Sequence, residues 1–429
     1  MPHGSSVQRP LNWTRLDNAA IIFPPTSRGT DPGVFRMSCR LKETVDPQLL
    51  QKTLETTLSQ FPHMQVVLRR GLFWYYLEQS DLIPQVEPEE TPICAPLYRG
   101  SRTLLFRVSW WKDKINLELF HVLADGSGAI IFFQALILCY LKLCHPQALA
   151  GLEVPIPTLG RSEDGFAKYY RPGHGKSSRL ILSYHLRGSR YLTGQLSAIE
   201  GVASVDQVLQ AAHKWNTTLT CYLCAVLIEA IRSQMRERDL RLPVALTVPV
   251  DLRGYFPSDT ARNFFSTIRV AYDFSRRSGT FEDIITQASQ SFHEQLKIDC
   301  LAQRINALAA LEHSPLLRPI PLVVKNQVLR LARWIASLGE TLTLSNVGKI
   351  HLPQPAADYV REFSIFSGTR YAQLCTCTYG GMLHMGYTSM LRSSEIPQRF
   401  FHRLVQDQIQ VEIRSNGHYV ADTAEREDV

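Results

Sequence analysis

One short stretch of the sequence, LELFHVLADGSGAIIFFQALI (residues 117–137), holds a histidine and an aspartate at a spacing suited to proton transfer. His121 is followed after three residues by Asp125 and Gly126. The pKa of an unperturbed imidazole is about 6.5, so a neutral histidine accepts protons near neutral pH. A positioned base of this kind accelerates a reaction by about 10²- to 10⁴-fold. The stretch therefore raises the hypothesis that His121 is a general base.

The surrounding pattern predicts where this histidine lies. Apolar residues alternate with others along one face of a predicted strand, and the histidine continues that row: Ile115, Leu117, Leu119 and His121. A turn follows, in which we expect Gly126 and Gly128 to adopt backbone conformations closed to other residues. The apolar run after Gly128 predicts a helix. Spacing alone leaves two interpretations of His121 open: a base at the end of a sheet, or a core histidine hydrogen-bonded to backbone. Asp-Gly by itself is an ordinary turn dipeptide.

Length and composition set the scale of the fold. The chain has 429 residues, of which 45% are apolar and 20% charged, as in globular proteins. This length favours two domains or subdomains. A segment rich in proline, glycine and charge predicts a linker over residues 151–177, between an N-terminal subdomain (1–150) and a C-terminal subdomain (178–429).

Strand and helix signals alternate in both halves. Predicted strands cover residues 19–23, 33–41, 64–70, 72–78, 103–111, 115–123, 179–187, 243–256, 262–274, 341–348, 372–379 and 382–389. Predicted helices cover residues 46–61, 129–144, 217–238, 280–311, 321–338 and 398–412, the first opened by a capping Asp46. This mixture predicts an α/β or α+β sandwich in two related halves.

Several classes of protein are disfavoured by the sequence. The net charge of +7 is spread along the chain without the basic–aromatic tracts of nucleic-acid binders. Nine cysteines without framework spacing indicate a reducing compartment, and the N-terminus lacks the apolar core of a signal peptide, so we expect a cytoplasmic protein. The most apolar window, residues 129–144, is short for a membrane span, so no stable membrane insertion is expected.

Two cysteine patterns suggest metal binding but have simpler explanations. Cys221 and Cys224 form a C-x-x-C inside an apolar helical run with no second pair. Alternation along one sheet face accounts for Cys375, Cys377 and His384. No metal site is therefore predicted. The basic helix KNQVLRLARW (325–334) leaves open a solvated face, or contact with a membrane or an acidic carrier protein.

Three motifs resemble those of the chloramphenicol acetyltransferase-like superfamily, which includes condensation domains of nonribosomal peptide synthetases. Residues 121–126 (HVLADG) match its HxxxDG motif, residues 248–265 (VPVDLRGYFPSDTARNFF) resemble its PVxxR…N stretch, and residues 343–350 (TLSNVGKI) resemble an SN(L/V)G stretch. The DFGWG signature of the plant BAHD branch is absent. The chain is most similar to stand-alone bacterial acyltransferases of the alcohol acetyltransferase-like type.

This resemblance implies both a fold and a chemistry. The expected fold is two subdomains packed in a V, with a substrate channel at their junction. His121 would take a proton from an acceptor hydroxyl or amine as the acceptor attacks a thioester carbonyl. No covalent acyl-enzyme is needed, in agreement with the absence of a G-x-S-x-G nucleophile elbow.

The resemblance also assigns roles to residues in the second half. Arg253 would form a buried ion pair with Asp125 and so hold the turn that carries His121. Ser345 and Asn346 are candidates to bind the oxyanion of the tetrahedral intermediate. The other interpretation is that SNVG is a strand-ending turn, where Ser, Asn and Gly are common.

The expected co-substrate is an acyl-CoA, with an acyl carrier protein thioester as the alternative, and no permanently bound cofactor is implied. The expected partner is a small-molecule alcohol or amine, with an acyl carrier protein as a further candidate. A different class of hypothesis is a non-catalytic binding module that has kept the fold. The intact histidine, aspartate, glycine and matching arginine argue against that class.

Overall fold

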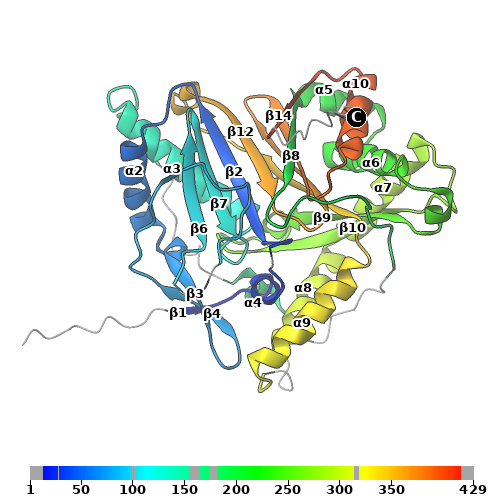
Figure 1. The fold of residues 1–429 in the computed structure, drawn as a ribbon, viewed down its shortest axis with the longest axis horizontal. Coiled ribbons are helices and arrows are strands. Elements are labelled where there is room, and N and C mark those ends of the chain that lie inside the picture. The colour runs from blue at the N-terminus through cyan, green and yellow to red at the C-terminus, as the bar shows by residue number, and fades with distance from the viewer. Residues whose placement is uncertain are drawn as a thin grey trace, which may run out of the picture.

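The computed structural model describes residues 13–27, 29–98, 100, 102–154, 164–172, 181–313 and 318–416. In that part of the chain the strands form three sheets, with helices packed around them (Figure 1). The fold is the predicted mixture of helix and sheet. Short 3₁₀ helices join the main elements: η1 (Ala20–Ile22), η2 (Pro62–Met64), η4 (Glu237–Arg241), η5 (Leu252–Gly254) and η6 (Ala356–Tyr359).

The first half is built on a five-stranded sheet in the order β12-β2-β7-β6-β5. These strands are β12 (Val360–Ser367), β2 (Val34–Leu41), β7 (Lys114–Phe120), β6 (Phe106–Trp111) and β5 (Glu87–Pro88). Helices α2 (Pro47–Gln60) and α3 (Gly126–Cys144) pack on each other beside this sheet. As predicted, Asp46 caps the N-terminus of α2, where its carboxylate accepts hydrogen bonds from the backbone of Gln48 and Leu49.

Strand β7, which leads into the candidate site, is buried on both faces. Ile115, Leu117 and Leu119 enter the apolar core of the first half, together with Phe132 of α3. On the opposite face Glu118 is fully buried and forms ion pairs with Arg36 and Arg107. A buried carboxylate needs such partners, because an uncompensated charge inside a protein is costly. The charged pairs thus fix β7 against β2 and β6.

The second half is built on a seven-stranded sheet in the order β10-β9-β11-β13-β14-β8-β15. Its strands are β10 (Phe265–Tyr272), β9 (Val244–Asp251), β11 (Leu342–Lys349), β13 (Ala372–Tyr379), β14 (Met382–Ser389), β8 (Ser197–Ser204) and β15 (Val411–Ser415). The helices of this half are α5 (Val205–Lys214), α6 (Leu219–Arg232), α7 (Phe281–Gln295) and α10 (Glu395–Gln406). The apolar helix α6 lies at the centre and touches the other three.

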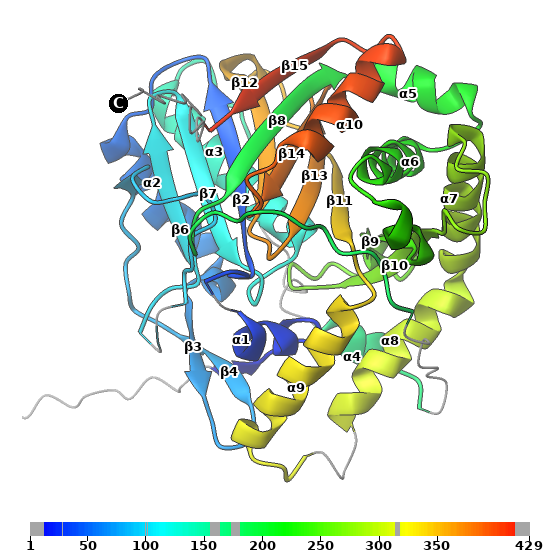
Figure 2. The same cartoon turned by 45° about the vertical axis from the view of Figure 1, so that its right-hand side comes forward.

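A third group of elements lies below the two large sheets (Figure 2). It contains a small sheet in the order β1-β4-β3 and four helices. The bounds are β1 (Trp13–Arg15), β3 (Val66–Arg70), β4 (Tyr75–Gln79), α1 (Phe23–Thr26), α4 (Gly165–Tyr169), α8 (Ile298–His313) and α9 (Leu322–Ser337). Helix α1 packs against α9, and α4 packs against α8.

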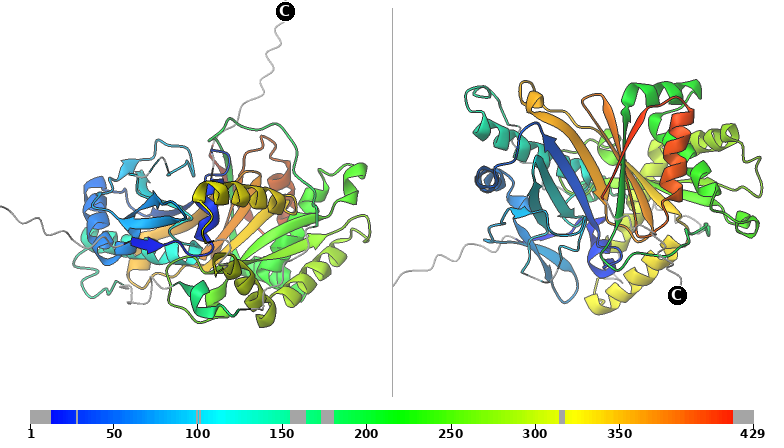
Figure 3. Two further views of the ribbon diagram at one scale, coloured as in Figure 1. Left: turned by 90° about the horizontal axis from the view of Figure 1, so that it is seen from below. Right: turned by 45° about the horizontal axis from the view of Figure 1, so that its top comes forward.

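Strand β12 connects the two halves in a way that the sequence does not indicate. It comes from the predicted C-terminal subdomain, yet it pairs with β2 of the first half, with Ser364 opposite Ser38. It also contacts β13 and β14 of the seven-stranded sheet. Figure 3 shows this orange strand lying beside the blue and cyan strands of the first half.

Some predicted elements differ from the observed ones. The predicted strand 19–23 is wrong: these residues form η1 and the start of α1, in which Pro24 and Pro25 occupy the first turn. The part of predicted strand 179–187 that the structure describes, residues 181–187, is not a strand. The predicted helix 280–311 is two helices, α7 and α8, and the end of the predicted helix 398–412 is strand β15.

Within the described residues, α3 is the one helix long and apolar enough to cross a membrane by length and composition. Its packing explains that character, because ten of its residues are buried in the protein. It is a core helix of the first half, as the sequence predicts for residues 129–144.

Candidate active site

The candidate site lies in the turn between the end of β7 and the start of α3. His121 directly follows β7, and its backbone N–H donates to the carbonyl of Gly33, 2.8 Å away. Asp125 is the residue that caps the N-terminus of α3, where its carboxylate accepts from the N–H of Gly128 at 2.9 Å. The histidine is therefore held between a strand end and a capped helix, which fixes its backbone.

Aromatic rings surround the imidazole. Phe23 of α1 stacks on it with ring centroids 4.8 Å apart and planes 4° from parallel. Phe35 of β2 lies 4.9 Å away and Phe265 of β10 lies 5.8 Å away. Burial among these groups lowers the pKa of His121, because an apolar environment disfavours the charged imidazolium. The imidazole is consequently neutral at neutral pH, the form that a base requires.

Asn263 determines which imidazole nitrogen is free. Its amide N–H₂ faces two acceptors, the carbonyl of His121 at 3.0 Å and the carboxylate of Asp17 at 3.3 Å. Its amide oxygen therefore faces Nδ1 of His121, 3.3 Å away. Nδ1 must carry the hydrogen of that bond, which leaves the lone pair on Nε2. The geometry thus prepares Nε2 as the proton acceptor.

Asp17 supports Asn263 from a fully buried position. Its carboxylate accepts from the N–H of Ala20 at 2.8 Å, and the guanidinium of Arg262 lies 3.6 Å from it. Burial raises the pKa of Asp17 to about 6, with Arg262 acting in the opposite direction. Through Asp17, the loop before α1 is thus held against the segment that carries Arg262 and Asn263.

The structure brings together Asp125 and Arg253, the pair that the resemblance implies. The guanidinium makes two parallel bonds to the carboxylate, of 2.9 and 3.2 Å. Its remaining N–H groups donate to the carbonyls of Thr260 and Arg262 and to the carboxylate of Asp251. All five donors of Arg253 are used, so a lysine has no equivalent geometry there.

Asp125 also binds the second half through its backbone. Its Oδ2 accepts from the N–H of Phe264 at 2.8 Å, one residue beyond Asn263. One carboxylate therefore caps α3, pairs with Arg253 and fixes the strand entry that carries Asn263 and Phe265. Asp125 is therefore a positioning residue: it holds the turn that follows His121 and the segment that carries Asn263 and Phe265.

The glycines after Asp125 are explained by close packing. We expected Gly126 and Gly128 to adopt backbone conformations closed to other residues, but neither has a positive φ. A Cβ on Gly128 would lie 1.9 Å from the carbonyl oxygen of Ala261. One on Gly126 would lie 2.9 Å from the side chain of Val347. Both glycines let the second half approach the start of α3.

The two oxyanion candidates lie on different faces of β11. Ser345 is paired with Cys375, which belongs to the core of the first half, so its side chain faces that half, as Val347 does. Asn346 points to the other face, where its amide donates to Thr220 at 2.9 Å. It also accepts from the N–H of Gly348 at 3.0 Å. The structure therefore does not bring Asn346 to the side of the sheet that carries the imidazole.

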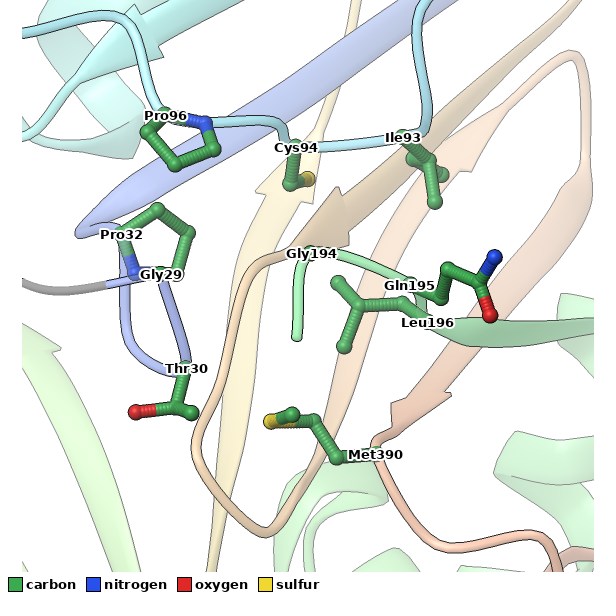
Figure 4. A pocket seen from close by; sticks show the side chains of 10 residues that line it. All are labelled: Gly29, Thr30, Pro32, Ile93, Cys94, Pro96, Gly194, Gln195, Leu196 and Met390. Carbon is green, nitrogen blue, oxygen red and sulfur yellow. The ribbon is translucent and has the colours of Figure 1, made fainter. Parts of the chain in front are cut away.

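A small hollow opens at the seam between the two halves (Figure 4). Its walls come from the segment before β2, the loop before β6, the entry to β8 and the end of β14: Gly29, Thr30, Pro32, Ile93, Cys94, Pro96, Gly194, Gln195, Leu196 and Met390. Burial raises the pKa of the Cys94 thiol well above its ordinary value. Cys94 is therefore a protonated thiol at neutral pH, unsuited to nucleophilic catalysis.

Metal ligation finds no support in the described residues, which contain no group of three or more His, Cys, Asp or Glu side chains able to hold an ion. Cys221 and Cys224 are buried in α6. His384 lies opposite Cys377 across the β13–β14 pair and hydrogen-bonds Glu200 at 3.1 Å.

Sequence reasoning gave no role to several residues of the site, among them Asn263 and Phe23. Asn263 is the asparagine of the stretch that resembles PVxxR…N, so the motif includes this residue, but the sequence indicates no role for it. Phe23 gave no signal, because it belongs to the apolar run that predicts a strand.

Comparisons with known proteins agree with this architecture. No protein-family model and no curated protein sequence matches the chain. Among solved structures, polyketide synthase associated protein 5 from Mycobacterium tuberculosis aligns with a TM-score of 0.62 at 14% identity, over 91% of this chain and 96% of that one. TRI101 of F. graminearum, in complex with coenzyme A and deoxynivalenol, aligns with a TM-score of 0.64 at 12% identity, over 93% and 99%.

The first condensation domain of the calcium-dependent antibiotic synthetase, in complex with a substrate analogue, aligns with a TM-score of 0.60 at 13% identity, over 94% of this chain and 99% of that domain. TRI3, the trichothecene 15-O-acetyltransferase from Fusarium sporotrichioides, aligns with a TM-score of 0.61 at 9% identity, over 94% of this chain and 96% of that one. The chain thus has the chloramphenicol acetyltransferase-like fold that condensation domains share, as its sequence motifs predict.

Proposed function

We propose that this protein transfers an acyl group from a thioester, acyl-CoA in the first instance, to the hydroxyl or amine of a small molecule. The observation that carries the proposal is the state of His121. The imidazole is neutral, with Nδ1 donating to Asn263, so that Nε2 carries the lone pair that can accept a proton. No other described histidine combines this arrangement with a strand end at the junction of the two halves.

In the proposed reaction, Nε2 of His121 takes the proton of the acceptor as its oxygen or nitrogen attacks the thioester carbonyl. The tetrahedral intermediate collapses, the carbon–sulfur bond breaks, and the leaving thiolate takes the proton back from the imidazolium. We assign stabilisation of the oxyanion to Ser345 alone, because its side chain faces the first half. Substrates would reach His121 along the seam between the two halves.

Two features of the comparisons support this assignment at the level of the fold. TRI101 is complexed with coenzyme A and a small-molecule acceptor, deoxynivalenol, and the condensation domain is complexed with a substrate analogue. A carrier-protein thioester is therefore retained as the alternative donor. The proposal includes a cytoplasmic location, since a CoA thioester is an intracellular donor.

The test is release of free thiol from a panel of acyl-CoA esters, from acetyl to long chain, with mixed alcohols and amines as acceptors. Wild type, His121→Ala and a matched control, His402→Ala on α10, are compared at equal folded concentration. Release by wild type and the control, but not by His121→Ala, supports the proposal. Release only from carrier-protein thioesters assigns the alternative donor. Acyl-CoA binding without turnover, equal in all three proteins, overturns catalysis in favour of a binding module.

A further inference from the structure

The outer face of α9 is apolar although it faces away from the protein. Six of its side chains have large exposed fractions: Val323 56%, Val324 51%, Val328 60%, Leu331 55%, Trp334 51% and Ile335 38%. At 100° per residue they form a stripe about 140° wide, in which Gln327 is the one polar residue that projects outward from the middle. The opposite face is the buried one, with Leu322, Asn326 and Ser337.

The tip of the β3–β4 hairpin lies against the start of α9 and adds two exposed apolar side chains, Leu72 and Trp74. The N–H of Leu322 donates to the carbonyl of Leu72, and the ammonium of Lys325 donates to that of Phe73, at 2.8 and 3.0 Å. Leu72 is 71% exposed and Trp74 43% exposed. Figure 2 shows the hairpin and the yellow helix side by side at the lower end of the molecule. We call these eight residues of helix and hairpin the α9 surface.

Cations lie at the margins of the α9 surface. On the helical projection Lys325 and Arg330 flank the stripe on its two sides. Arg330 donates to the carbonyl of Pro25 at 2.8 Å, and Lys325 donates to backbone carbonyls. Because these acceptors are uncharged, the hydrogen bonds do not neutralise the two positive charges. At the hairpin, the guanidinium of Arg15 lies 5.1 Å from the ring of Trp74. The apolar centre and the cationic margins suit a surface that is apolar inside and anionic at its boundary.

A lipid bilayer with anionic headgroups has this chemistry. Helices that lie in a membrane interface have a wide apolar face with tryptophan and leucine, and basic residues beside it. Basic residues close to an anionic leaflet are attracted to its negative surface potential. An acidic protein partner would instead favour cations within the contact area, and here the middle of the stripe is apolar. We propose that the α9 surface binds the face of an anionic bilayer without spanning it.

Helix α9 is connected to the candidate active site through α1. Helix α9 packs on α1, and α1 carries Phe23, whose ring stacks on His121. A bilayer docked on α9 would thus be separated from the imidazole by these two helices. The membrane inference does not depend on the proposed acyl transfer, since binding is measured without turnover.

The experiment is flotation of the full chain with vesicles of phosphatidylcholine alone, or of phosphatidylcholine with 30% phosphatidylglycerol, at low and high salt. The double variant Val328→Glu/Leu331→Glu tests the surface. Val405→Glu on α10, where the side chain is 53% exposed, is the matched control at a distant site. We expect wild type and the control to float with anionic vesicles, more weakly at high salt, and the double variant to lose about tenfold or more of its partitioning. Thermal melting shows that the variants are folded.

Equal flotation of wild type and the double variant overturns the proposal, as does absence of wild-type binding to anionic vesicles. Light scattering and carrier-protein binding then identify the occupant. A wild-type dimer that the double variant dissociates, without vesicle binding, assigns the surface to a second copy of this chain. Loss of carrier-protein binding in the double variant, again without vesicle binding, assigns it to a protein partner.

Discussion

Asn263 hydrogen-bonds the side chain and the backbone carbonyl of the same residue, His121, with its amide oxygen and its amide nitrogen. The two residues come from different halves of the chain. The tautomer of the candidate base in the first half is therefore determined by a residue of the second half.

The pH dependence of turnover follows from the burial of His121. A general base must be unprotonated, and burial lowers the pKa of His121 below 6.5. We therefore expect the acidic limb of kcat/KM to be centred below pH 6.5. Initial rates between pH 4.5 and 8 measure this, and an acidic limb centred above 6.5 would contradict the assignment.

Replacement of Asn263 by alanine tests its role in selecting the tautomer. Its hydrogen bond raises the pKa of His121 against the effect of burial, so its loss moves the acidic limb to lower pH. A hydrogen bond to a charged group is worth about 1.5–3 kcal/mol, so kcat should fall about 10- to 100-fold. A fall in kcat with no movement of the acidic limb would indicate a structural role alone.

The ion pair of Asp125 and Arg253 should matter more for stability than for the chemical step. Removing one partner of a buried pair costs about 3–5 kcal/mol, because the other charge is left uncompensated. Asp125→Ala and Arg253→Ala should each lower the free energy of unfolding by that amount, measured by urea denaturation. The double variant should lose much less than the sum of the two. Additive losses would show that the pair is not coupled.

The two glycines at the start of α3 should differ in their tolerance of a methyl group. In Gly128→Ala the new Cβ meets a backbone carbonyl at 1.9 Å, which cannot move without shifting the second half. In Gly126→Ala it meets the side chain of Val347 at 2.9 Å, which can adjust. Overpacking costs about 1–3 kcal/mol, and Gly128→Ala should lie at or beyond the upper end. Thermal melting of both variants gives the comparison; equal Tm values would contradict it.

Ser345 and Asn346 form a matched pair of variants on adjacent residues. Removal of one oxyanion donor lowers kcat by about 10²- to 10³-fold, so Ser345→Ala should lose turnover with its Tm unchanged. Asn346→Ala should keep turnover and lose about 1 kcal/mol of stability, because it removes the hydrogen bond to Thr220. The opposite result would return the oxyanion role to Asn346.

Asp17 should make the protein less stable as the pH rises from 4 to 6. The pKa of Asp17 in the folded state, about 6, lies above the ordinary value of 3.8, so the folded state binds more protons in this window. The free energy of unfolding contributed by Asp17 is present below pH 4 and is lost as the pH rises through 6, by about 3 kcal/mol. Asp17→Asn should remove this slope in urea titrations at pH 4.5 and 7. An identical slope in the variant would contradict the prediction.

The parts of the site that the sequence predicts are those with local patterns. His121 follows an alternating strand, Asp125 lies at a helix start, and the PVxxR-like stretch leads to Arg253. Local pattern does not reveal contacts between distant segments. The charged network of Glu118 with Arg36 and Arg107 is one such contact, since the alternation shows only that Glu118 faces away from the apolar core.

Two features of the fold also depend on more than the local apolar pattern: the structure of residues 19–23 and the sheet that β12 joins. The apolar run 19–23 predicts a strand by composition, but the prolines that follow have no N–H to donate to a sheet, and the chain coils into α1. Strand β12 joins the sheet of the first half by pairing across more than 300 residues of sequence, and the sequence of residues 360–367 does not specify which strand it joins.

The place of β12 in the first sheet has a consequence for biosynthesis. While the ribosome is still translating the second half, β2 has its free edge exposed, because the strand that covers it is made some 320 residues later. Such an uncovered edge readily pairs with other nascent chains. The protein cannot complete its first half before almost the whole chain has emerged, so slowing translation near residue 360, or releasing a chain truncated before it, should yield aggregates that a chaperone must hold.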